Sequence, residues 1–176
     1  MQSIQTVSEN TIYVGASDRR LAKFENLFPI PRGVSYNAYV ILDEKTALLD
    51  TADASVGAQF LENVAAALDG RKLDYLIVDH MEPDHAAMIE AVLVRWPDLR
   101  LVVNAKTLPM LKMYFPTDSA AIDDALVVKE GDTLDLGKHK LTFVMAPMVH
   151  WPEVMMTFDT TTGTLFSADA FGTFGA

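Results

Sequence analysis

One short segment, Asp79-His80-Met81-Glu82-Pro83-Asp84-His85, limits the folds open to this chain more than any other feature. It holds four side chains of the kinds that bind metal ions, all within six residues: His80, Glu82, Asp84 and His85. An apolar run at 75–78 precedes the segment and another at 86–89 follows it, which is typical of a strand, a loop and a helix. Because α/β proteins build their sites at the carboxyl ends of strands, the segment predicts a metal-binding loop in such a fold.

The hydrophobic pattern predicts strands, then alternating strands and helices, then strands again. Two hairpins are expected first, with strands at 4–7 and 11–15 and at 35–42 and 46–50. Helices are expected at 56–68, 84–95 and 107–114, with buried strands at 73–78 and 101–103 between them. Further strands are expected at 126–128, 133–136, 141–146, 154–158 and 164–167. This order predicts an α/β protein with a mixed sheet covered by helices and a second sheet against it.

The formal net charge of −10 and the lack of cysteine restrict what this chain can bind. Nucleic acids and anionic membrane surfaces attract basic proteins, so the charge argues against both partners. Without cysteine there is no disulfide, no thiolate zinc site and no cysteine-ligated iron–sulfur cluster. Residues 1–8 lack the pattern of a secretory signal, and no apolar run reaches membrane-spanning length. We therefore expect a cytoplasmic protein whose metal ligands are His, Asp, Glu, backbone atoms or water.

Each residue of the loop also has an ordinary structural interpretation. Asp84 suits the N-cap of the following helix, with the three residues before it as a plain turn. His80 and His85 suit polar positions at a surface edge. Four such residues in six, directly after a buried strand, favour a metal site over these interpretations.

Two residues far along the chain are placed as His80 is, just after a predicted strand. His150 follows the strand expected at 141–146, and Asp169 follows the strand expected at 164–167. Taken alone, His150 suits a structural histidine between apolar neighbours, and Asp169 suits a turn. Their shared position at strand ends makes both of them candidate ligands.

The candidate ligands are three imidazoles and three carboxylates: His80, His85, His150, Glu82, Asp84 and Asp169. Imidazole suits zinc, copper and iron, and carboxylate is a hard ligand, so the set favours a pair of ions and iron more than zinc. Asp169 has two oxygens with which it can bridge two metals. A redox-active pair with open positions binds O2 or NO, whereas two zinc ions generate hydroxide for hydrolysis.

Residues 80–85 resemble the loop of the metallo-β-lactamase superfamily, which carries H-x-H-x-D-H. Here Glu82 stands at the second histidine position, and in this replacement the chain resembles the flavodiiron proteins. Further segments are similar to the same family, at 18–20, 24–31, 33–39, 150–152 and 165–172. The resemblance covers nearly the whole chain.

The resemblance implies an αββα sandwich with a non-haem diiron site that reduces O2 to water or NO to N2O. It implies that His80, Glu82 and His150 hold one iron. Asp84 and His85 would hold the other, and Asp169 would bridge the two.

The same resemblance implies a source of electrons outside this chain. In the family, electrons come from FMN in a flavodoxin-like domain, with a rubredoxin-type protein as a further donor. A head-to-tail homodimer brings that flavin near the diiron site of the partner subunit. Trp151, next to His150, is therefore expected to line the site or to contact the partner's flavin, with core packing as the alternative.

Two departures from the family pattern bear on these expectations. The β-lactamase-like domain of the family is longer, with its last iron ligand, a histidine, in the part without counterpart here, and residues 1–176 also contain no flavodoxin-like domain. The spare histidine, His139, matches no family motif and is expected in an exposed hairpin turn. We therefore expect residues 1–176 to be the amino-terminal part of the diiron domain. Another polypeptide or a dimer partner would complete it, unless the chain is a truncated product with partial function.

Two other classes of function stay open. A dinuclear zinc hydrolase of the glyoxalase II kind shares the fold and most ligand positions, and Glu82 in place of histidine argues against it. A diiron site without flavin would bind or sense O2 without turning it over. A purely structural role with no metal is the remaining alternative.

Overall fold

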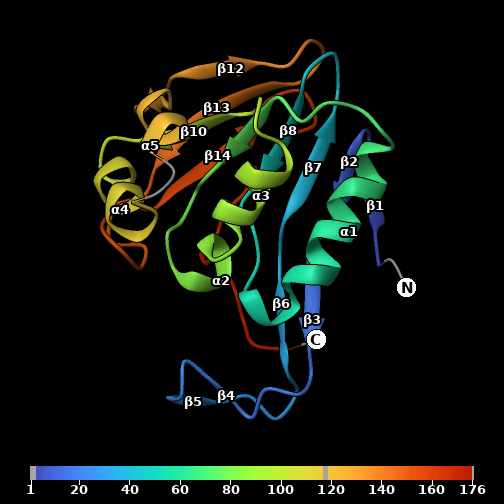
Figure 1. Ribbon diagram of the computed structural model, residues 1–176, viewed down its shortest axis with the longest axis vertical. Helices are drawn as coiled ribbons and strands as arrows, with labels where there is room; N and C mark the ends of the chain where they lie inside the picture. The colour runs from blue at the N-terminus through green and yellow to red at the C-terminus, as the bar shows by residue number, and fades with distance from the viewer. Residues whose placement is uncertain (1–2, 117–118, 176) are drawn as a thin grey trace.

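A computed structural model describes residues 3–116 and 119–175 and arranges them in layers of helices and sheets (Figure 1). The larger sheet in these residues has seven strands in the order β1-β2-β7-β8-β9-β10-β11. Their bounds are β1 (Gln5–Ser8), β2 (Thr11–Tyr13), β7 (Tyr39–Leu42), β8 (Thr46–Leu49), β9 (Tyr75–Ile77), β10 (Arg100–Asn104) and β11 (Leu126–Val128). Strands β8 to β11 pair in parallel and the others pair antiparallel, so the sheet is mixed as predicted.

The smaller sheet is antiparallel and consists of consecutive strands. It contains β12 (Thr133–Asp135), β13 (Lys140–Met145), β14 (Met155–Asp159) and β15 (Thr164–Phe166). Two further pairs lie outside both sheets: β3 (Ala16–Asp18) with β6 (Val34–Tyr36), and β4 (Lys23–Phe24) with β5 (Phe28–Pro29). The β4–β5 hairpin projects at the bottom of the view in Figure 1.

The helices cover one face of the larger sheet. They are the short 3-10 helix η1 (Ala54–Val56), α1 (Gly57–Leu68), α2 (Pro83–Ala86), α3 (Ile89–Arg95), α4 (Thr107–Tyr114) and α5 (Ser119–Asp123). Helix α1 buries Phe60, Val64 and Leu68, which recur at helical spacing on one face. It ends at Asp69, whose left-handed backbone is followed by Gly70, also at positive φ.

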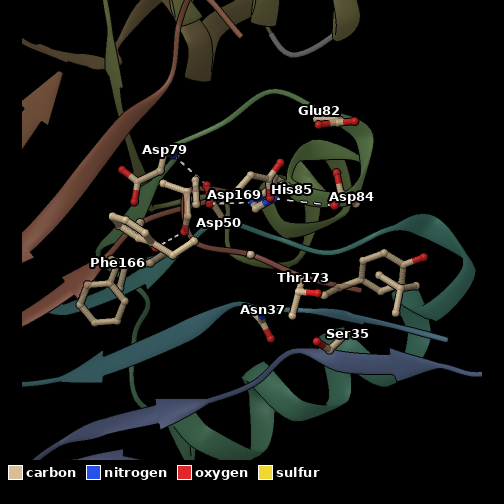
Figure 2. A pocket seen from close by; sticks show the side chains of 18 of the residues that line it. Ser35, Asn37, Asp50, Asp79, Glu82, Asp84, His85, Phe166, Asp169 and Thr173 are labelled. Carbon is tan, nitrogen blue, oxygen red and sulfur yellow. Dashed lines mark hydrogen bonds and ion pairs between the residues drawn. The ribbon is translucent and has the colours of Figure 1, made fainter. Parts of the chain in front are cut away.

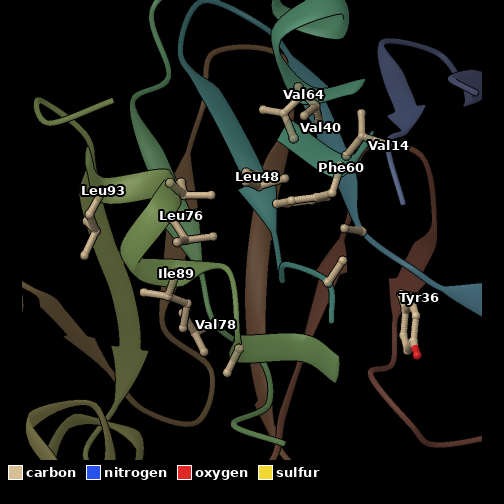
Figure 3. Packing of buried hydrophobic residues seen from close by; sticks show 14 of the residues in the cluster. Val14, Tyr36, Val40, Leu48, Phe60, Val64, Leu76, Val78, Ile89 and Leu93 are labelled. Atoms are coloured by element: carbon tan, nitrogen blue, oxygen red, sulfur yellow. The ribbon is translucent and has the colours of Figure 1, made fainter. Parts of the chain in front are cut away.

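The two faces of the larger sheet belong to two separate cores, because successive side chains of a strand point to opposite faces. In β8, Leu48 packs toward the helices with Phe60 and Leu76 (Figure 3). Its neighbours Ala47 and Leu49 pack toward the smaller sheet, against residues such as Phe143. The predicted α/β class, with helices on a mixed sheet and a second sheet against it, is confirmed.

The outer face of the smaller sheet has no helix against it within the described residues. All five α-helices of these residues bury their side chains in the core on the other side of the larger sheet. Val144, Met156 and Phe158 lie on the outer face and are partly exposed. The described chain therefore forms three of the four layers of the expected αββα sandwich.

The strand predicted at 35–42 and the helix predicted at 84–95 are each two elements. Val34–Tyr36 pairs with β3 and Tyr39–Leu42 pairs with β2 and β8, so the chain changes sheet between them. The helix is interrupted at Ala87 and Met88 between α2 and α3. The predictions also missed β3, β4, β5 and α5, which are all five residues or shorter.

Thr51 is the reason for the break in the helix. Its backbone N–H and its hydroxyl both donate to the carbonyl oxygen of His85, at 2.8 Å and 2.6 Å. That carbonyl would otherwise accept from Ile89 in a continuous helix. The Thr51 hydroxyl also accepts from the backbone N–H of Met88 at 3.3 Å, which satisfies a donor at the break.

Replacing Thr51 with valine is expected to lower the free energy of unfolding of the metal-free chain by about 1–3 kcal/mol, because the buried His85 carbonyl loses its hydroxyl donor and the Met88 N–H loses its acceptor. Urea denaturation measures this. Thr133→Val, at an exposed position of β12, is the matched control. Equal stability of the two variants would contradict the role given to the Thr51 hydroxyl.

None of the helices formed by the described residues has both the length and the apolar composition needed to cross a membrane.

Candidate metal centre

The site lies where the ends of strands from both sheets meet. Asp50 and Asp79 lie just beyond the ends of the parallel strands β8 and β9, on the same edge of the larger sheet. Strand β14 begins at this edge, and the backbone N–H of Met155 donates to the carbonyl oxygen of Asp79 at 3.0 Å, which joins the two sheets. The loop before β14 carries His150, and the turn after β15 carries Asp169. The sheet ends therefore bring together segments that are far apart in the sequence.

All six side chains predicted as ligands come together there. They form two groups within which one potential ligand atom of each residue lies within 4.8 Å of the others. The first group is His80, Glu82, His150 and Asp169, and the second is Asp84, His85 and Asp169. Figure 2 shows Asp169 beside His85, with Asp84 next to them and Glu82 farther along the same loop. The two groups share one carboxylate, that of Asp169, which could contribute to two neighbouring ions.

Asp169 faces imidazoles with both of its oxygens. Its Oδ1 lies 2.7 Å from His85 Nε2, and its Oδ2 lies 3.1 Å from His150 Nε2 and 3.5 Å from His80 Nε2. Burial alone would raise the pKa of Asp169, but hydrogen bonding from His85 outweighs it and holds that pKa below its usual value. The carboxylate thus stays ionised between the two groups.

The two buried histidines are oriented by carboxylates behind them. His80 Nδ1 lies 2.7 Å from Glu153 Oε1, and His85 Nδ1 lies 2.9 Å from Asp50 Oδ2. A histidine whose Nδ1–H is bound by a carboxylate presents Nε2 as its metal-binding atom. In both residues Nε2 points toward Asp169.

Glu82 closes the first group. Its Oε2 lies 2.8 Å from His150 Nε2 and 3.2 Å from His80 Nε2. The hydrogen bond with His80 lowers the pKa of Glu82 despite its burial. His150, in contrast to His80, is exposed on the side of the cleft.

Asp84 supplies a direct test of whether these residues fit a cation. Its Oδ1 is buried and has no hydrogen-bond partner among the described residues, and burial raises the pKa of Asp84 to about 6. The N-cap role considered for Asp84 is wrong, since Glu82 occupies the N-cap of α2 and neither residue caps it through a side chain. A buried carboxylate oxygen without a donor is expensive unless a cation approaches it. The donor set fits a pair of divalent ions.

The protonation of the buried histidines also indicates a site that suits cations. Burial opposes protonation of His80 and His85, yet the hydrogen bonds that His80 donates to Glu82 and His85 donates to Asp169 raise the pKa of both imidazoles. In the metal-free protein, protons on these rings offset the charge of the surrounding carboxylates. Metal ions would replace those protons.

A cleft of about 1000 Å³ opens over the site. Aromatic side chains line much of it, including Phe24, Tyr39, Phe166 and Trp151. The Trp151 ring stands edge-on to the His80 ring, with centroids 5.3 Å apart and planes at 90°. Trp151 therefore lies beside the first group and on the cleft wall at the same time.

The sequence analysis did not single out three carboxylates that lie at or near the site. Asp50 is the last residue of the strand predicted at 46–50, so its place at a strand end is a signal similar to the one that singled out Asp169. Glu153 has no such signal, because only the folded chain places it behind His80. Glu25, in the β4–β5 turn, also lines the cleft, and burial together with the Glu82 carboxylate raises its pKa.

The expectation that His139 is an exposed hairpin residue is wrong. Its side chain is buried, and its Nδ1 lies 2.8 Å from Asp159 Oδ2. Asp159 ends β14, the strand that begins at the metal site, so His139 lies at the opposite end of the sheet. Its backbone N–H donates to Asp43 in the turn between β7 and β8, which covers the hairpin. His139 is thus unable to complete either group of ligands.

The sequence of this chain matches a known family model and several curated proteins. The model of a family described as ODP family beta lactamase matches residues 34–176. Putative diflavin flavoprotein A 1 of Thermosynechococcus vestitus is 38% identical over 169 residues, which cover 94% of this chain and 28% of that protein. The anaerobic nitric oxide reductase flavorubredoxin of Klebsiella pneumoniae is 37% identical over 168 residues, which cover 94% of this chain and 34% of that protein. The chain thus spans about a third of the length of these curated relatives.

Solved structures agree with this relationship and with the predicted metallo-β-lactamase-like fold. The flavodiiron protein of Giardia intestinalis matches with a TM-score of 0.92 and 28% identity, covering 100% of this chain and 42% of that one. Rubredoxin oxygen:oxidoreductase of Desulfovibrio gigas matches with a TM-score of 0.92 and 32% identity, covering 99% of this chain and 43% of that one. The resemblance to flavodiiron proteins is confirmed, and the chain belongs to the ODP beta-lactamase family.

Proposed function

We propose that this chain carries the ligands of a non-haem diiron centre that reduces O2 to water, NO to N2O, or both. The observation that carries this proposal is the pair of donor groups sharing Asp169, with a carboxylate, Glu82, in the first group. Carboxylate-rich sets with imidazole suit iron. Relatives of the chain are named for both gases, as a nitric oxide reductase and as an oxygen oxidoreductase.

In this proposal His80, Glu82 and His150 would hold one iron, and Asp84 and His85 would hold the other. Asp169, which belongs to both groups, would contribute to both sites. When bound, the iron pair would supply the redox chemistry of the reaction. The protein contributes two oriented imidazoles, the charge of three carboxylates, and a cleft wall with aromatic side chains that include Trp151.

The electrons would come from a flavin on another domain or subunit, either FMN of a flavodoxin-like domain or a chain that begins at a rubredoxin-type donor. The chain spans about a third of its curated relatives, whose printed names include a diflavin flavoprotein and a flavorubredoxin. Residues 1–176 would then be the amino-terminal part of the β-lactamase-like diiron domain. A homodimer or a completing polypeptide would supply what this part lacks, including a further ligand for the second iron.

A zinc hydrolase is the competing function, and Glu82 argues against it. Glu82 adds a third carboxylate to the candidate ligands, and the extra negative charge favours two iron ions, whose oxidation states change, over two zinc ions.

The test is to load the chain anaerobically with ferrous iron and measure the metal content per chain by elemental analysis. Close to two irons per chain is expected, with oxidation by O2 or reaction with NO faster than for the same ferrous iron in buffer. Two bound irons that react with neither gas would overturn the proposal. Preferential binding of zinc together with thioester hydrolysis would replace it with the hydrolase.

A further inference from the structure

Glu153 lies in the loop between β13 and β14, three residues after His150, and its side chain is fully buried. Its carbonyl oxygen accepts from the side chain of Asn104 at 2.6 Å. Asn104 in turn accepts from the backbone N–H groups of Lys106 and Thr107 at the start of α4, at 2.8 Å and 3.1 Å. The backbone of Glu153 is therefore fixed by β10 and α4, independently of any ligand.

The side chain of Glu153 reaches from this loop to the other ligand-bearing loop. Its Oε1 accepts from His80 Nδ1 at 2.7 Å and from the backbone N–H of Met81 at 3.1 Å. Because His150 and His80 both belong to the first donor group, Glu153 connects the two loops that build that group.

The second oxygen of Glu153 has no partner. Oε2 is buried and makes no hydrogen bond to any described residue, whereas both oxygens of Asp50, behind His85, accept one. An ionised carboxylate left short of donors in the interior is destabilising unless positive charge lies close by. His80 is the neighbour that can supply this charge, because its ring can carry a proton or a metal ion on Nε2.

We propose that Glu153 is a positioning residue, which holds the Nδ1–H of His80 so that Nε2 faces Glu82 and Asp169 and binds a divalent cation more tightly. The inference rests on the proposed metal centre and adds a residue that contacts no metal. It predicts a selective effect, because Glu153 touches a ligand of the first group and none of the second.

The first experiment observes the ring protons of His80 by NMR in the metal-free chain. A hydrogen-bonded Nδ1–H of His80 is expected in the unaltered chain and in Glu153→Gln, whose amide oxygen still accepts. It is expected to be lost in Glu153→Leu. An unprotonated Nδ1 in the unaltered chain would overturn the proposal, and this measurement decides the question even where metal binding fails.

The second experiment measures cobalt binding by absorption spectroscopy in two backgrounds. Asp84→Asn leaves the first group to bind the ion, and His150→Ala weakens the first group and leaves the second. Adding Glu153→Leu, which removes the acceptor behind His80, is expected to weaken binding by about 10–100-fold in the Asp84→Asn background. It is expected to leave binding unchanged in the His150→Ala background.

Glu62→Leu, at an exposed position of α1, is the matched control and should change neither affinity. Equal weakening in both backgrounds would mean that Glu153 only supports the fold, and unchanged affinity in both would equally overturn the proposal. No cobalt binding in any background would instead count against the proposed metal centre, and the ring protons of His80 would then decide the role of Glu153.

Discussion

Replacing Asp169 with asparagine is expected to lower the affinity of the chain for a second divalent ion by at least about a hundredfold. Asp169 is the residue that both donor groups share, and its two oxygens lie against His85 on one side and His150 on the other. Asparagine keeps the shape of the side chain, but its nitrogen is a donor that cannot bind a cation. The substitution also removes the negative charge that offsets the repulsion between two neighbouring cations.

Metal content after equilibration with excess ion, and cobalt titration, measure this effect. The unaltered chain should approach two ions and Asp169→Asn one or fewer. Asp98→Asn, an exposed carboxylate after α3, is the control for charge alone. Thermal unfolding of the metal-free variants separates loss of binding from loss of fold. Two tightly held ions in Asp169→Asn would show that the groups bind independently of a shared carboxylate.

The affinity for divalent ions is expected to rise steeply with pH between about 6 and 8, by about tenfold per pH unit for each proton that an ion displaces. Burial opposes protonation of His85, but the hydrogen bonds that its ring donates to Asp169 and Asp50 raise its pKa well above the usual value. Burial raises the pKa of Asp84 to about 6. Below these values the proton occupies the atom that the metal needs.

The stability of the metal-free chain should change in the opposite direction. A histidine with a raised pKa stabilises the fold below its unfolded pKa, and that stability is lost as pH rises through the folded pKa. Asp84, whose pKa is also raised, weakens the fold in the same sense at lower pH, as pH rises from the usual range of a carboxyl to about 6. Raising pH over this range therefore weakens the metal-free fold while it strengthens metal binding.

Calorimetric titration in two buffers of different ionisation enthalpy counts the protons released on binding. More than one proton is expected near neutral pH, and His85→Gln should release about one fewer. Urea denaturation of the metal-free chain over the same pH range supplies the second half of the comparison. Metal binding that releases no proton would contradict the interpretation that these histidines are protonated before the ions bind.

Much of the fold follows from local pattern. The helix at Thr107–Tyr114 and the strand at Leu126–Val128 have the bounds that the hydrophobic pattern predicts. These segments alternate or repeat with one period along their whole length, so neighbouring residues suffice to specify them. The loop at 79–85 is specified in the same way, because its ligands are adjacent in the chain and its strand and helix are both apolar.

Where long-range contacts compete with local preference, the local prediction is wrong. Local preference favours a continuous helix at 84–95. Thr51, which follows β8, donates two hydrogen bonds to the carbonyl oxygen of His85, and these interrupt the helix. His139 is placed in a hairpin turn that is polar and therefore reads as exposed. The turn between β7 and β8 covers it, through Asp43.

The sequence by itself determined the side-chain types of the candidate ligands and the strand ends that they follow, because both depend on residues close together in the chain. The tertiary structure alone decided how the ligands divide into two groups around Asp169, and which carboxylates stand behind the histidines. Glu153 and His80 are separated by 73 residues. Their contact exists only because the ends of two sheets pack against each other at β9 and β14, and no local preference encodes that packing.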